Sequence, residues 1–150
     1  MKIIVDANIV FSGILNSNGK IGDLLINSSN FFSFIAPDFL RTEIYNHHEK
    51  LVKISNLTLE KILESEYQIC KSIRFMSEEQ IDERSWQFAA ELTYDIDPKD
   101  IIYIAYAQQF ESKVWTGDKK LISGLRKKGY SQIFTTDDLF IIRNNQLTYN

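Results

Sequence analysis

Four acidic residues stand where an apolar run ends or where a helix is expected to begin. They are Asp6, Glu43, Asp100 and Asp118. If they lie together without a cation, their carboxylates repel one another at a cost on the order of several kcal/mol. Mg²⁺ or Mn²⁺ would relieve this repulsion, because both ions prefer carboxylate oxygens and water as ligands. Such ions activate water and stabilise the leaving oxygen of a phosphodiester, so these residues predict phosphoryl chemistry.

The elements that would position these acids alternate between strand and helix. Apolar, β-branched runs predict strands at residues 2–5, 31–36, 113–116 and 132–134. Apolar residues at helical spacing and capping signals predict helices between these runs, and residues 57–93 are predicted to be wholly helical. This alternation predicts an α/β fold, a three-layer α/β/α sandwich with a central, mainly parallel sheet.

The topology of such a fold explains why the acids should meet. Right-handed crossovers place the N-terminus of each helix at the edge where the parallel strands have their carboxyl ends. Ligands bind at this edge, where the strand order reverses. Asp6 and Asp118 directly follow strands, whereas Glu43 and Asp100 lie in early turns of helices that begin near Pro37 and at Asp97-Pro98. We therefore expect all four carboxylates on one rim.

Each acid also has an ordinary structural explanation. Asp6 could cap a turn, Asp118 could be a helix N-cap, and Asp100 could complement a helix dipole. Glu43 could be solvated surface, as most helical glutamates are. Asp97, just before Pro98, is either a fifth metal ligand or only a helix cap. The prediction therefore depends on the set and not on any one member.

Composition sets the broad class of the protein. A chain of 150 residues, 44% hydrophobic and 25% charged, suits one folded domain spanning residues 1–150. No apolar stretch reaches the ~18 residues that a membrane span needs, and the acid at position 6 interrupts any signal-peptide core. Cys70 is the one cysteine, which excludes an internal disulfide, so we expect a cytoplasmic protein. The net charge of −3 argues against binding nucleic acid by phosphate neutralisation alone.

Motifs along nearly the whole chain resemble the PIN-domain nucleases. They are Asp6-Ala7-Asn8-Ile9-Val10-Phe11-Ser12-Gly13, Glu43, Asp97-Pro98-Lys99-Asp100 with Ile104-Ala105, and Trp115-Thr116-Gly117-Asp118. The resemblance is closest to the toxin components of toxin–antitoxin modules, VapC-like in the broad sense. Many of these toxins carry a further polar residue after the last motif, where this chain has Leu121. The fourth acidic position therefore depends on Asp118 alone.

The resemblance implies a function and a set of residue roles. It implies an endoribonuclease dependent on Mg²⁺ or Mn²⁺, with RNA as substrate, frequent homodimers and a small cognate antitoxin as inhibitor. Carried onto this chain, the catalytic and metal-binding residues are Asp6, Glu43, Asp100 and Asp118. Asn8 would orient Asp6, and the Thr116 hydroxyl would hold a carboxylate or a water on the metal.

Basic residues near the expected rim have two interpretations. Lys99, Lys119 and Lys120 could contact the RNA backbone, and Arg126-Lys127-Lys128 at the other end of the same helix could extend that surface. A solvated face with charges matched to the helix dipole is the alternative. The helical middle of the chain could form a dimer or antitoxin surface, or could simply complete the core.

Two other functions remain possible on these residues. A catalytically inert PIN-like module could bind RNA or a protein, although it would have no need to keep all four acids. An aspartyl-nucleophile phosphatase would use Asp6, but that chemistry needs an acid two residues later, where this chain has Asn8. The sequence therefore favours the metal-dependent ribonuclease.

Overall fold

A five-stranded parallel sheet forms the centre of the protein, in a computed structural model that describes residues 1–149. The strands are β1 (Lys2–Val5), β2 (Ser33–Pro37), β3 (Ile73–Met76), β4 (Lys113–Trp115) and β5 (Ile133–Phe134), in the order β3-β2-β1-β4-β5. All four strand pairings are parallel. The chain builds outward from β1 in one direction and then in the other, so the strand order reverses between β1 and β4.

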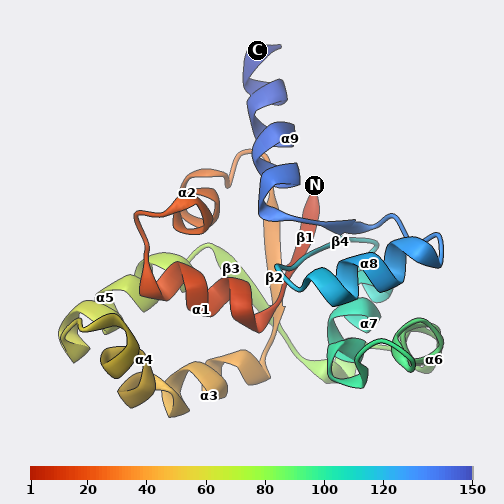
Figure 1. The fold of residues 1–150 in the computed structure, drawn as a ribbon, viewed down its shortest axis with the longest axis horizontal. Coiled ribbons are helices and arrows are strands. Elements are labelled where there is room, and N and C mark those ends of the chain that lie inside the picture. Colours follow the sequence, from red (N-terminus) through yellow and green to blue (C-terminus); the bar gives the residue numbers. More distant parts are fainter. Residues whose placement is uncertain (150) are drawn as a thin grey trace.

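Helices cover both faces of this sheet (Figure 1). They are α1 (Ala7–Leu15), α2 (Lys20–Asn27), α3 (Phe39–Asn46), α4 (His48–Ser55), α5 (Leu59–Cys70), α6 (Glu83–Thr93), α7 (Ile101–Gln109), α8 (Lys119–Lys127) and α9 (Thr136–Thr148). Short 3₁₀ turns occur at Glu78–Gln80 and Pro98–Asp100. Within residues 1–149, no helix is long and apolar enough to cross a membrane.

Alternation along the strands divides the core into two layers. Ile3 and Val5 point to the face covered by α1, α2 and α5, whereas Ile4 points to the face covered by α7 and α8. Side chains of neighbouring strands follow the same period of two, as β-strand geometry requires. Trp115 joins the first layer and Val114 the second. The three-layer α/β/α sandwich with a parallel sheet is thus confirmed.

The prediction that residues 57–93 are wholly helical is wrong. This segment contains the edge strand β3, which pairs with β2 in the register Phe34↔Ile73 through Pro37↔Met76. Ile73, Phe75 and Met76 form an apolar run too short for periodicity to separate strand from helix, and only the neighbouring strand decides. The capping signal at Ser77 begins a 3₁₀ turn, and α6 begins at Glu83 with Asp82 as its N-cap.

Helix α1 also went unpredicted, since the sequence suggested only a strand end at Asp6. Its residues include Ile9, Val10 and Gly13, which have modest or poor helix propensity. Burial against α2 and α5 outweighs that propensity, and Gly13 lies so close to Ile69 and Leu25 that an added Cβ would be 3.1 Å from each. Asp6 therefore ends a strand and caps a helix at once.

Candidate metal centre

The predicted acids gather where β1 and β4 lie side by side. Val5 pairs with Trp115 in the parallel register, and the Asp6 N–H donates to the Trp115 carbonyl at 3.3 Å. The residues that follow each strand, Asp6 on one and Thr116 on the other, therefore leave the sheet together. This is the point at which the strand order reverses, where α/β proteins bind ligands.

Asp6 is buried at this edge, with a residue exposure of 4%. It is the N-cap of α1, and its Oδ1 accepts the Ile9 N–H at 2.8 Å. Burial raises the pKa of Asp6, and the negative charge of Asp118 raises it further. Hydrogen bonds from Thr116 and from the Ile9 N–H act in the opposite direction and lower the pKa. The carboxylate is thus held rigidly in a place where its negative charge is poorly solvated.

Thr116 links the acids of the two strands. Its side chain is fully buried, forms the hydrogen bond to Asp6, and accepts the Asp118 N–H at 3.0 Å. Asp118 is the N-cap of α8, where its Oδ1 accepts the N–H groups of Lys120 at 2.9 Å and Leu121 at 3.0 Å. One hydroxyl therefore sets the spacing between β1, β4 and the start of α8.

Asp100 reaches the same edge from the N-terminus of α7. One carboxylate oxygen from each of Asp97, Asp100 and Asp118 lies within 4.8 Å of the other two. Burial raises the pKa of Asp100 to about 6, and the negative charges of Asp97, Asp118 and Asp6 add to the rise. These acids are therefore close enough to share a cation.

The hydrogen bonding of Asp100 tests whether a cation fits here. Its Oδ2 is buried and has no hydrogen-bond partner within residues 1–149. A buried carboxylate oxygen without a partner destabilises the fold. A hard divalent ion is a suitable partner, because such ions bind carboxylate oxygens. The donor set, all carboxylate oxygen with no sulfur or imidazole, suits Mg²⁺ or Mn²⁺ and not a softer metal.

Glu43 lies at the border of this group and outside its 4.8 Å core. It follows β2 on α3, and its Oε2 is 3.7 Å from Nδ1 of His47, with 46% of the side chain exposed. Burial is the main cause that raises the pKa of the Tyr103 hydroxyl, and the negative charges of Asp6, Asp100 and Glu43 raise it further. Glu43 therefore faces the same rim, and its role as a ligand stays a prediction.

The remaining predicted residues surround the acids. Asn8 is exposed, and the group that it offers to Asp6 is its backbone N–H. Lys99, Lys119 and Lys120 are exposed at the starts of α7 and α8, and they form no ion pair among the described residues. The three lysines are thus neighbours of the acids in sequence, and Lys119 also lines a surface groove with Arg126 and Lys127.

Tyr103 is a site residue that the sequence analysis did not predict. It is 6% exposed, and its hydroxyl accepts the Ala7 N–H at 3.2 Å at the start of α1. The only signal in the sequence is its position three residues after Asp100, which puts both on one face of a helix. Tyr103 therefore ties α7 to the strand end that carries Asp6.

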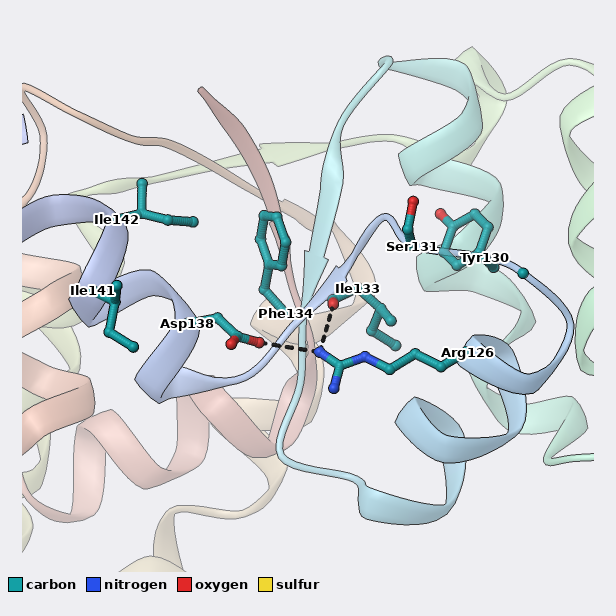
Figure 2. Close-up of a pocket in the computed structure, with 9 residues that line it drawn as sticks. Arg126, Tyr130, Ser131, Ile133, Phe134, Asp138, Ile141 and Ile142 are labelled. Carbon is teal, nitrogen blue, oxygen red and sulfur yellow. Dashed lines mark hydrogen bonds and ion pairs between the residues drawn. The ribbon is translucent and has the colours of Figure 1, made fainter. Parts of the chain in front are cut away.

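The basic group at residues 126–128 lies elsewhere. Figure 2 shows Arg126 in a pocket between α8, β5 and α9, where it donates to the Ile133 carbonyl at 3.4 Å and pairs with Asp138 at 3.2 Å. Lys128 pairs with Asp95 and donates to the Leu92 carbonyl at 2.9 Å. This pocket, of about 460 Å³, contains none of the clustered acids. Arg126 and Lys128 are therefore engaged in contacts within the fold.

Comparisons with known proteins agree with this geometry. A family model described as PIN domain matches residues 4–139. A solved structure, VapBC2 from Rickettsia felis bound to a DNA fragment from the promoter, superposes with a TM-score of 0.59. The similarity covers 90% of this chain and 97% of that chain at 11% sequence identity, so it concerns the fold. No curated protein sequence matches the chain.

Proposed function

Because the chain belongs to the PIN-domain family, we propose that it is a metal-dependent endoribonuclease and the toxin of a toxin–antitoxin module. The observation that carries this proposal is the gathering of Asp97, Asp100 and Asp118 around a buried carboxylate oxygen without a partner, with Asp6 near enough for its charge to act on Asp100. An inert binding module would have no reason to keep repelling charges at the switch point of the sheet, since they destabilise the fold.

In this proposal Asp6, Glu43, Asp100 and Asp118 hold Mg²⁺ or Mn²⁺. Bound divalent ions would lower the pKa of the attacking water and would neutralise charge on the leaving oxygen of the phosphodiester. Thr116 fixes Asp6 relative to Asp118, and Asn8 holds Asp6 through its backbone amide. The exposed Lys99, Lys119 and Lys120 attract the RNA backbone to a site that is otherwise acidic.

The partner in this proposal is a small antitoxin. Support comes from the fold shared with VapBC2, whose structure contains DNA from a promoter. Exposed apolar side chains on α3, α4 and α5, among them Tyr45 and Leu59, border a surface groove of about 1010 Å³ that also includes His48 and Glu66. We assign a homodimer or antitoxin contact to this part of the surface.

The proposed substrate is cellular RNA, so the protein would act in the cytoplasm.

Cleavage assays test the enzyme. The purified protein and the Asp6→Asn variant are incubated with single-stranded and structured RNAs in Mg²⁺, Mn²⁺ or EDTA. Asn keeps an oxygen to accept the Ile9 N–H, so the variant should fold and fail to cleave. The matched control is Asp137→Asn, which makes the same change at an exposed surface residue.

Each outcome of this assay has a distinct meaning. Cleavage that requires metal and is lost only in Asp6→Asn supports the ribonuclease. Full cleavage by that variant would remove Asp6 from the catalytic residues. Absence of any cleavage, together with absence of Mn²⁺ binding in calorimetry, would favour the alternative, a catalytically inert module that binds RNA or protein.

A further inference from the structure

Asp97 has a larger part in the acidic site than its helix cap requires. We propose that Asp97 is a metal ligand, which with Asp100 and Asp118 forms one cation position. Glu43 takes no part in this position, so its share in the proposed site belongs to a second ion. The inference rests on the proposed function, because it refines which carboxylates hold the ions. It departs from the ligand set that the sequence predicts, in which Glu43 is a member and Asp97 is undecided.

Geometry is the first support for this ligand set. Within residues 1–149, the only group of three or more His, Cys, Asp or Glu residues whose ligand atoms lie within 4.8 Å of one another is Asp97, Asp100 and Asp118. This spacing is close to the one that a shared ion needs, and small rotations of the carboxylates would bring one oxygen of each to the short distances that Mg²⁺ requires. Glu43 lies outside the group, with its carboxylate 3.7 Å from His47 and almost half exposed.

The capping role of Asp97 is compatible with metal binding. Its Oδ1 accepts the Lys99 N–H at 3.0 Å, which fixes the carboxylate at the start of the turn that leads into α7. A carboxylate has two oxygens and about four acceptor sites, so one cap bond leaves most of its capacity unused. Asp118 combines the same roles at the start of α8, where its Oδ1 accepts two backbone N–H groups.

The unpartnered oxygen of Asp100 is independent support for an ion at this position. Asp100 Oδ2 is buried and lacks a hydrogen-bond donor among the described residues. Lys99, the neighbour in sequence, is exposed and forms no ion pair with it among residues 1–149. No protein cation therefore offsets the charge of these three acids, and an external cation is the remaining partner.

Asparagine substitutions separate the cap from the ligand. Asn caps helices about as well as Asp, so Asp97→Asn keeps the bond to the Lys99 N–H and removes the charge. Asp82→Asn is the matched control. Asp82 is the exposed N-cap of α6, its Oδ1 accepts the Ser85 N–H at 2.7 Å, and its own N–H donates to Gln109 at the far end of α7. Since α7 has nine residues, its two ends are about 13 Å apart, and the control lies at the end far from Asp100.

Binding of Mn²⁺ to the intact protein is measured by calorimetry and by the rise in unfolding temperature. We expect Asp97→Asn to weaken binding of the first ion about tenfold or more, because affinity follows the number of charged ligands. Glu43→Gln should change that affinity less than about threefold, and Asp82→Asn should leave it unchanged. Without metal, Asp97→Asn should unfold at the same temperature as the wild type or higher, since repulsion is relieved.

Two results would overturn the inference, and they are distinguishable. If Asp97→Asn binds Mn²⁺ as the wild type does while Asp6→Asn or Asp118→Asn does not, Asp97 is only a cap and the proposed nuclease stands. If the wild type binds no Mn²⁺ at all, the proposed function and this inference both fail. A larger loss in Glu43→Gln than in Asp97→Asn would also reject the ligand set.

Discussion

A single buried hydroxyl organises the acidic site at the scale of residues. Thr116 accepts the Asp118 N–H and bonds to Asp6, so it links two strands and two helix caps. Both bonds follow from the register Val5↔Trp115, which sets Asp6 and Thr116 side by side. The acids therefore occupy positions fixed by backbone pairing, which suits a site that must hold ions in defined geometry.

Removing this hydroxyl should uncouple the two acids. We expect Thr116→Val to lower the free energy of unfolding by about 1–2 kcal/mol, because the Asp118 N–H loses its partner in a buried setting. Metal affinity and RNA cleavage should fall about tenfold or more, as for other groups that orient ligands. Urea denaturation and Mn²⁺ titration measure the two effects, and Thr116→Ser should retain both properties. Equal behaviour of Val and Ser variants would contradict the proposed role.

The raised pKa of Asp100 should make the metal-free protein sensitive to pH. A carboxyl whose folded pKa, about 6, exceeds its unfolded value binds more protons in the folded state between about pH 4 and 6. The unfolding free energy therefore falls as pH rises through that window. In EDTA, Asp100→Asn should lack this component and should gain stability over the wild type as pH rises from 4.5 to 7. A difference that stays constant with pH would exclude the coupling.

At the scale of elements, an arginine attaches α9 to the sandwich. Figure 1 shows α9 projecting from the layers, and of its residues only Leu139 is buried. Arg143 donates to Asp23 of α2 at 2.7 Å and to the Ser28 hydroxyl at 3.0 Å, with 11% of its side chain exposed. A planar guanidinium reaches both acceptors at once, so this side chain joins α9 to α2, as the Lys20–Asp137 pair also does.

Replacing this arginine should loosen α9 and leave the acidic site intact. Arg143→Lys carries the same charge on a single donor group, which cannot reproduce the fork of bonds to Asp23 and Ser28. We expect faster amide hydrogen exchange across residues 139–148, with Mn²⁺ affinity unchanged. Lys20→Arg, at an exposed surface pair with Asp137, is the control. Unchanged exchange in α9 would show that Leu139 and its neighbours suffice as an anchor.

Local signals predicted the ends of elements better than their contacts. Asp97-Pro98 marks a real helix start, with Asp97 as the N-cap of the turn that leads into α7. β3 was missed because four residues show no clear period, and their identity as a strand comes from pairing with β2. Tyr103 was not predicted as a site residue, because nothing in the sequence reports that its hydroxyl meets the start of α1.

At the scale of the whole molecule, the proposed function requires an acidic protein to attract an acidic substrate. The net charge is −3, and the lysines nearest the site are few. Lys119 and Lys120 stand in the first turn of α8, free of ion pairs among the described residues, directly after Asp118. RNA binding should therefore depend on metal and on a small number of phosphate contacts, with a shallow dependence on salt.

Neutralising these lysines tests that view. The Lys119→Gln, Lys120→Gln double variant should bind single-stranded RNA several-fold more weakly. The slope of log affinity against log salt should become shallower by about 1.4, because each of the two lost phosphate contacts contributes ~0.7. Its Mn²⁺ affinity should not fall. The control replaces the exposed Lys50 and Lys53 of α4, which lie outside the acidic site. Equal salt slopes in the two double variants would mean that RNA approaches from another side.

The pairing of β1 with β4 sets when the acidic site can exist during synthesis. Asp6 emerges from the ribosome about 110 residues before Thr116 and Asp118. β2 and β3 can add to β1 first, since they precede β4 in the sequence, but the register Val5↔Trp115 forms only after β4 is made. A nascent chain that carries Asp6, Glu43, Asp97 and Asp100 therefore lacks both the bridge and the last carboxylate. If the protein is the ribonuclease proposed above, its incomplete chains would not cleave the RNA of the ribosome that makes them.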